Sequence, residues 1–218
     1  MTARVKRARR RLALLVAALA CAFAASACVG SGPPASKTSV MGPSRLTAEQ
    51  IANWFYAEFP HARPYMLNTT PEQLAALFVW EGAQENVRGD MAFAQAVVET
   101  NWFIYGNQVQ WWQNNYAGIG ACDSCSGGIA FSSPHAGVRA QIQHLRNYAD
   151  PGSRTWNLHN PPVTELYNPP SEFNTFFKKG AAPDWTQMGN GNWASSTTYA
   201  NTVMTMYGRM LDYNDVAP

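Results

Sequence analysis

A single carboxylate, Glu99, lies in the otherwise uncharged stretch AFAQAVVETNWF, residues 92–103. It is the only charged residue between Asp90 and Asp123. The stretch is typical of a helix that ends near Trp102. Because the C-terminal end of a helix carries negative partial charge, we expect the pKa of Glu99 to be raised. A carboxylic acid that is partly protonated near neutral pH can act as a general acid. A solvated glutamate without a chemical role is the alternative.

The segment that follows Glu99 combines aromatic rings with side-chain amides. Aromatic faces pack on the C–H faces of sugar rings, and amides exchange hydrogen bonds with hydroxyl and N-acetyl groups. An uncharged cleft of this composition beside an acid predicts a carbohydrate substrate, although the same rings could belong to the core. The segment contains Trp102, Tyr105, Trp111, Trp112 and Tyr116, interspersed with Asn101, Asn107, Gln108, Gln110, Gln113, Asn114 and Asn115.

Other ionisable residues offer weaker candidates. Glu81 and Glu85 are four residues apart and would share a helix face, which we expect to be solvated; lining of the cleft is the alternative. The histidines have no metal-ligand spacing and no neighbouring nucleophile, so neither a metal nor a cofactor is expected. They are His61, His135, His144 and His159.

Two cysteines, Cys122 and Cys125, form a C-x-x-C pair beside Asp123. A lone pair supplies only half of a zinc site, and no second pair completes it. In an exported protein such a pair usually forms a disulfide, which we expect here, with redox and metal roles as the alternatives.

Helix-start signals are frequent along the chain. Thr47 with Gln50, and Thr70 with Gln73, form capping boxes ahead of apolar runs. A third helix is expected from Asp90, as its cap, through Glu99. After Trp102, loops and short strands are expected up to Phe131.

Helical patterns return in the second half of the chain. Ser133 and Pro134 start a helix with Val138, Ile142, Leu145 and Ala149 on one face. A short helix is expected at 171–179. A final helix carries an apolar stripe, expected to pack in the core, of Tyr199, Val203, Met206, Tyr207 and Met210.

The first 27 residues have the pattern of a secretory signal, with a basic start followed by the apolar run 12–23. Cleavage would leave Cys28, a candidate for lipidation, at the new N-terminus; simple cleavage without lipid is the alternative. Residues 28–45 are rich in Gly, Pro and Ser and predict a flexible tether, followed by one domain at 46–214.

Charge argues against nucleic acid as a partner. The leader carries six of the 16 basic residues and no acidic residue, so 10 basic and 14 acidic residues remain after cleavage. Phosphate binding requires a basic surface, which this balance does not provide.

Four segments together resemble one known family. They are MAFAQAVVETNWF, NNYAGIGA, FSSPHAGVRAQIQHLRNYA and WASSTTYANTVMTMYGRML, and the likeness covers most of residues 74–211. The chain is similar to the bacterial endo-β-N-acetylglucosaminidases (glucosaminidases), peptidoglycan hydrolases of the lysozyme-like superfamily. The resemblance implies a mainly α, lysozyme-like α+β domain with a small β-lobe after the catalytic helix.

The resemblance also assigns residues. The family's catalytic acid falls on Glu99, and its second carboxylate on Asp123, the only acid of the expected lobe. Trp193 replaces one family tyrosine, whereas Tyr199 matches the second. The expected substrate-binding residues are Gln95, Trp102, Asn115, Tyr116, Trp193 and Tyr199.

The activity that the resemblance implies is hydrolysis of the β-1,4 bond after N-acetylglucosamine in the glycan strands of peptidoglycan. Asp123 would activate water, or the N-acetyl group of the substrate would assist instead. A lytic transglycosylase and a non-catalytic wall-binding module are the alternatives. We expect an exported monomer, at the cell envelope or secreted, that contacts a membrane only through lipid on Cys28.

Overall fold

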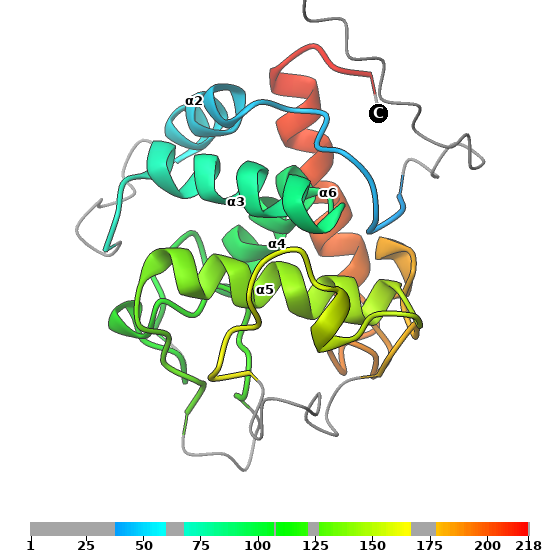
Figure 1. Cartoon of the computed structure of the whole chain (residues 1–218). Helices are drawn as coiled ribbons and strands as arrows, with labels where there is room; N and C mark the ends of the chain where they lie inside the picture. Colours follow the sequence, from blue (N-terminus) through cyan, green and yellow to red (C-terminus); the bar gives the residue numbers. More distant parts are fainter. Residues whose placement is uncertain (1–37, 60–67, 107, 122–126, 167–177, 218) are drawn as a thin grey trace, which may run out of the picture. The chain divides into compact units, whose positions relative to one another are not determined.

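The computed structural model describes residues 38–59, 68–106, 108–121, 127–166 and 178–217 (Figure 1). Within these ranges, no helix is both long enough and apolar enough to cross a membrane. Several expectations lie outside the described residues: the signal peptide at 1–27, the helix at 171–179 for all but its last two residues, Cys28, Cys122, Asp123 and Cys125.

Two capping boxes start the first two described helices, α2 (Ala48–Glu58) and α3 (Pro71–Glu85), as the sequence predicts. The Thr47 hydroxyl accepts from the Gln50 backbone N–H at 3.2 Å, and the Gln50 side chain accepts from the Thr47 N–H at 2.9 Å. Thr70 and Gln73 repeat the arrangement. These contacts satisfy backbone donors that a helix start leaves unpaired.

The helix that carries Glu99, α4, runs from Gly89 to Glu99, and its N-cap is Arg88. The expectation that Asp90 caps it is wrong, because Asp90 lies inside the first turn. Its buried carboxylate accepts from the Arg45 backbone N–H at 2.7 Å and from the Tyr207 hydroxyl at 2.8 Å. Asp90 therefore joins α4 to two distant segments.

The later helices α5 (Pro134–Ala149) and α6 (Tyr199–Tyr213) follow the expected patterns. The Ser133 hydroxyl caps α5 by accepting from the Ala136 N–H at 3.1 Å. The predicted apolar face of α5 is buried, and so is the stripe of α6 except for the half-buried Met206.

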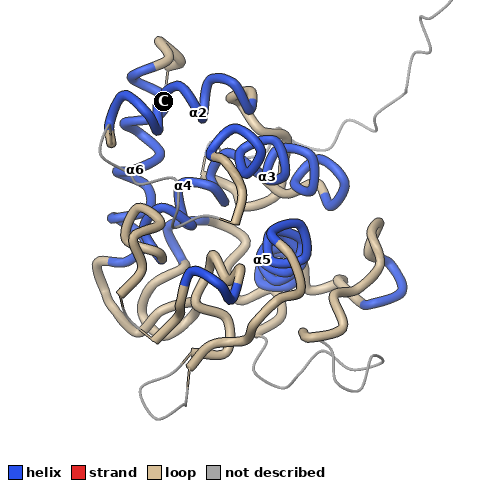
Figure 2. The backbone as a smooth tube through the Cα atoms, turned by 90° about the vertical axis from the view of Figure 1, so that its left-hand side faces the viewer, coloured by secondary structure: helices blue, strands red, loops and turns tan. Residues whose placement is uncertain are grey.

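Helix α4 lies at the centre of the described helices. It packs against α3, α5 and α6, while α3 also packs against α2 and α5 (Figures 1 and 2). The α3–α4 crossing is close, since a Cβ at Gly89 would lie 2.1 Å from the Phe78 carbonyl oxygen.

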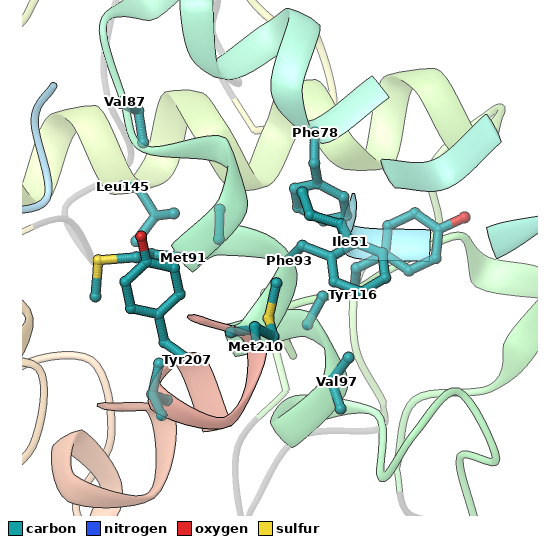
Figure 3. Packing of buried hydrophobic residues seen from close by; sticks show 14 of the residues in the cluster. Ile51, Phe78, Val87, Met91, Phe93, Val97, Tyr116, Leu145, Tyr207 and Met210 are labelled. Atoms are coloured by element: carbon teal, nitrogen blue, oxygen red, sulfur yellow. The ribbon is translucent and has the colours of Figure 1, made fainter. Parts of the chain in front are cut away.

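Core side chains from every one of these helices meet around α4, as Figure 3 shows for Phe93 and Val97 of α4 beside Phe78, Tyr116 and Met210. All residues of α4 from Gly89 to Val97 are buried. The core therefore fixes the helix that ends at Glu99.

The mainly α fold is confirmed, but the small β-lobe is not. The described residues contain no strand, only the isolated bridges Ser39–Asp184 and Met41–Val87. Between α4 and α5 the described chain forms loops and one 3₁₀ helix, η2 (Trp111–Gln113). Two more 3₁₀ helices follow, η3 (Thr155–Asn157) and η4 (Trp185–Gln187).

The end of the expected tether packs on the domain. Val40 is fully buried, its N–H donates to the Pro183 carbonyl at 3.0 Å, and its carbonyl accepts from the Arg88 N–H at 3.0 Å. The expectation of a flexible tether up to residue 45 is therefore wrong for residues 38–45, because these backbone contacts make them part of the domain.

Candidate active site

Glu99 is the last residue of α4, and one of its oxygens receives two hydrogen bonds. The Trp193 Nε1–H donates to Oε1 at 2.9 Å, and the Tyr199 hydroxyl donates to the same oxygen through a short hydrogen bond. Within the described residues, Oε2 receives none. A Cβ at Gly118 would lie 3.4 Å from Oε2, so the absence of a side chain at Gly118 leaves that side of the carboxyl group open.

Burial raises the pKa of Glu99 from 4.5 to about 7, while the hydrogen bonds from Tyr199 and Trp193 oppose this rise. Burial penalises the charged form, whereas donors stabilise it. The expected direction of the pKa shift is confirmed. Its leading cause is burial, and not the helix end that the sequence suggested.

A chain of buried amides orients the Tyr199 hydroxyl. The Gln141 side chain donates to the Gln95 Oε1 at 2.8 Å, and the Gln95 Nε2 donates to the Tyr199 oxygen at 2.8 Å. The tyrosine proton therefore points to Glu99. Gln95, expected to bind substrate, is fully buried and acts on Tyr199 instead.

Two aromatic side chains of α5 hold the Trp193 indole. The His144 ring lies 4.7 Å and the Tyr148 ring 5.3 Å from it, between centroids. The Tyr148 hydroxyl also donates to the Asn192 carbonyl at 3.2 Å. Burial lowers the pKa of His144 to about 3, so its ring is neutral at physiological pH.

Sequence reasoning missed these α5 residues, although a signal exists. Gln141, His144 and Tyr148 are spaced by three and four residues and therefore share one helix face. That face lies beside the apolar face of α5. Its mixture of polar and aromatic residues did not by itself indicate a functional site, because its contact with Trp193 is visible only in the structure.

A cavity of about 690 Å³ opens beside Glu99. Apart from Glu99, the described residues that line it are uncharged, which suits a neutral ligand. They are Thr100, Tyr105, Gln108, Val109, Asn115, Gly118, Ala121, Trp193 and Ala194.

Tyr105 contributes a hydroxyl without a partner. The side chain is buried, and its oxygen has no hydrogen bond within the described residues. Burial also raises the pKa of Tyr105, which keeps the hydroxyl protonated. The hydroxyl oxygen itself is closed off from solvent, and leaving it unpaired costs about 1–3 kcal/mol.

Asn115 lines the cavity but uses its side chain to shape the wall. Its Nδ2 donates to the Ile119 and Ile129 carbonyls at 2.8 and 3.0 Å, and its Oδ1 accepts from the Ile119 N–H at 3.0 Å. These bonds fix the loop that carries Gly118. Asn115 thus positions the wall and is not itself shown to bind a sugar.

Of two further residues expected in the cleft, Tyr116 is buried in the core and Trp102 packs against the core. Trp102 stacks on Phe59 and Trp54, with centroids 5.0 and 5.5 Å apart. Tyr116 meets Phe103 edge-on at 6.2 Å. Neither residue lines the cavity. The aromatic segment therefore divides between core and cavity.

Glu81 and Glu85 are buried, so the expectation of a solvated face is wrong. Glu81 accepts from Arg139 Nε at 2.8 Å and contacts His135 Nε2 at 2.6 Å. Glu85 pairs with Arg146. Helix α5 supplies these partners across the α3–α5 contact, which compensates the buried charges. Both carboxylates are used in packing and neither lines the cavity.

Asp123, Cys122 and Cys125 lie outside the described residues. Among those that are described, no group of three or more His, Cys, Asp and Glu side chains could hold a metal ion.

The sequence of the chain was compared with protein families, with known proteins and with solved structures. The family described as mannosyl-glycoprotein endo-beta-N-acetylglucosaminidase matches residues 75–212, which include the whole set around Glu99. The chain belongs to the glucosaminidase family. An uncharacterised protein of Borreliella burgdorferi is 28% identical to this glucosaminidase over 158 residues, covering 69% of this chain and 72% of that protein. No solved structure matches the chain. Family membership indicates a glycoside hydrolase that acts on peptidoglycan.

Proposed function

We propose that this glucosaminidase hydrolyses the β-1,4 bond after N-acetylglucosamine in peptidoglycan glycan strands, with Glu99 as the general acid. The observation that carries the proposal is the position of the partly buried Glu99 carboxyl group at an uncharged cavity, where burial raises its pKa to about 7. Such a group holds a proton near neutral pH and can transfer it to the leaving oxygen as the glycosidic bond breaks.

The two oxygens of Glu99 have different roles. Both donors converge on Oε1, so the proton resides on Oε2. After proton transfer, Trp193 and Tyr199 stabilise the carboxylate that forms. Gly118 leaves room for the leaving oxygen to approach Oε2.

Water activation has two candidates. Asp123 would serve as the base of an inverting reaction, which places two carboxyl groups about 6.5–9.5 Å apart. Assistance by the substrate's N-acetyl group requires no second carboxylate. Glu81 and Glu85 are poor candidates because their oxygens are bonded to cationic and amide partners.

Product analysis tests the proposal. Purified peptidoglycan is digested with the wild type, with Glu99→Gln and with Glu49→Gln, which makes the same change at an exposed site. Mass spectrometry should find free reducing N-acetylglucosamine ends from the wild type and Glu49→Gln. The rate for Glu99→Gln should fall by about 10²–10⁴-fold, the usual contribution of a general acid.

Two results would reject the proposal. Residual activity of Glu99→Gln within about tenfold of the wild type would exclude Glu99 as the acid. Anhydro-muramic ends would identify a lytic transglycosylase instead.

Access to peptidoglycan requires export, which we propose is directed by residues 1–27. In an oxidising compartment Cys122 and Cys125 would then form the expected disulfide. Labelling of free thiols in the denatured, unreduced protein from the cell envelope tests this pairing, and two reactive thiols at these positions would exclude it.

A further inference from the structure

Two adjacent tryptophans, Trp111 and Trp112, are exposed on η2. Their exposed fractions are 40% and 56%, whereas the next residue, Gln113, is buried. Exposed tryptophan rings offer large flat apolar surfaces that pack well on a ligand. Neither ring lines the cavity or belongs to the core. The proposed reaction therefore leaves them without a role.

The turn that carries the pair is rigid. The Gln113 side chain accepts from the Gln110 N–H at 2.6 Å and donates to the Gly128 carbonyl at 2.6 Å. Asn114 Nδ2 donates to the Phe131 carbonyl at 2.9 Å. A surface that is already ordered loses little conformational entropy when a ligand binds. This bracing favours a binding role over an incidental exposure.

The pair lies between two cavity-lining residues along the chain. Val109 and Asn115, on either side of it in sequence, both line the cavity. The Cα atom of Trp111 lies within about 7.6 Å of that of Val109, since consecutive Cα atoms are 3.8 Å apart. Residues 100–121 carry no charge. This stretch therefore suits a neutral polymer better than a phosphate or another anion.

A cavity of about 690 Å³ holds only a short piece of a polysaccharide, so the rest of a bound strand must pass over the rim. We propose that Trp111 and Trp112 form an aromatic platform that binds sugar rings of the same glycan strand outside the cavity. The inference rests on the proposed function in taking a glycan as the substrate. The platform would make the enzyme act more efficiently on long glycan strands than on short ones.

Binding without turnover tests the platform. The Glu99→Gln protein is mixed with insoluble peptidoglycan, with and without the added pair Trp111→Ala and Trp112→Ala, and the bound fraction is measured by sedimentation. Loss of the pair should weaken binding about tenfold or more, as expected for tryptophan rings that become buried against a ligand. The matched control is Trp156→Ala on η3, where the ring is 78% exposed. Its binding should stay within about twofold.

Turnover by the otherwise wild-type protein gives the second measurement. The double alanine variant should lose kcat/KM on long strands but keep it on a tetrasaccharide, and tyrosines at both positions should restore part of the loss. Unchanged binding to the wall, or an equal loss on both substrates, would overturn the platform. Failure of the proposed function is a different result: the wild type would then release no reducing N-acetylglucosamine ends. The sedimentation assay would still show whether Trp111 and Trp112 bind the wall.

Discussion

At the scale of single residues, Glu99 is subject to opposing influences. Burial favours the protonated carboxyl group, whereas the donors Trp193 and Tyr199 favour the carboxylate. Their balance gives a pKa near neutral pH. The two donors thus keep the acid from becoming too weak to release its proton, and this role predicts how their removal changes the pH profile.

We expect Tyr199→Phe to move the alkaline limb of the pH–rate profile to higher pH. Glu99 acts while protonated, so wild-type activity should fall as pH rises through about 7. Removing a donor to the charged form raises the pKa of Glu99 further, because the hydrogen bond from Tyr199 stabilises the carboxylate. Initial rates on soluble glycan strands between pH 5 and pH 9 measure this shift.

The matched control for this profile is Tyr207→Phe. It removes the hydroxyl of another buried tyrosine, one that donates to Asp90. The variant should be less stable, but its alkaline limb should coincide with that of the wild type. If the limb of Tyr199→Phe stays in place or moves to lower pH, the tyrosine does not stabilise the carboxylate.

At the scale of elements, the local signals predicted helices well. The capping boxes at Thr47 and Thr70 depend on residues three apart and can therefore be read from the sequence. Contacts between residues far apart in the sequence could not be predicted in this way. Asp90 resembles a cap but accepts from Tyr207, which lies 117 residues away. Glu81 resembles a solvated residue because Arg139, its partner, belongs to another helix.

Two helical glycines should respond in opposite ways to alanine, because Gly89 lies at the close crossing of α3 and α4 whereas Gly208 has open space around it. Gly89→Ala should lower the melting temperature by several degrees or more, because its Cβ would clash with the backbone of Phe78. Gly208→Ala in α6 meets nothing within 4 Å and should raise it by a few degrees, since alanine favours a helix by about 0.5–1 kcal/mol.

Thermal unfolding followed by circular dichroism compares the two variants with the wild type. A Gly89→Ala protein as stable as Gly208→Ala would show that α3 and α4 are not in close contact at this position.

At the scale of the whole molecule, resemblance predicted more than composition did. The mainly α fold follows from the family that the matched segments indicate. Trp193 and Tyr199 were expected to bind substrate, and their hydrogen bonds to Glu99 were not predicted. The resemblance did not show which aromatic residues enter the cavity. Tyr105 and Tyr116 both belong to the core cluster, yet only Tyr105 also lines the cavity.

The central claim is that Glu99 carries a proton near neutral pH, and its own titration tests it most directly. Carboxyl ¹³C chemical shifts of the glutamate-labelled protein are followed from pH 3 to pH 9, and the Glu99 signal is assigned by its absence in Glu99→Gln. The account predicts an apparent pKa of about 7. A value near the ordinary 4.5 would leave Glu99 ionised at neutral pH and would contradict its assignment as the general acid.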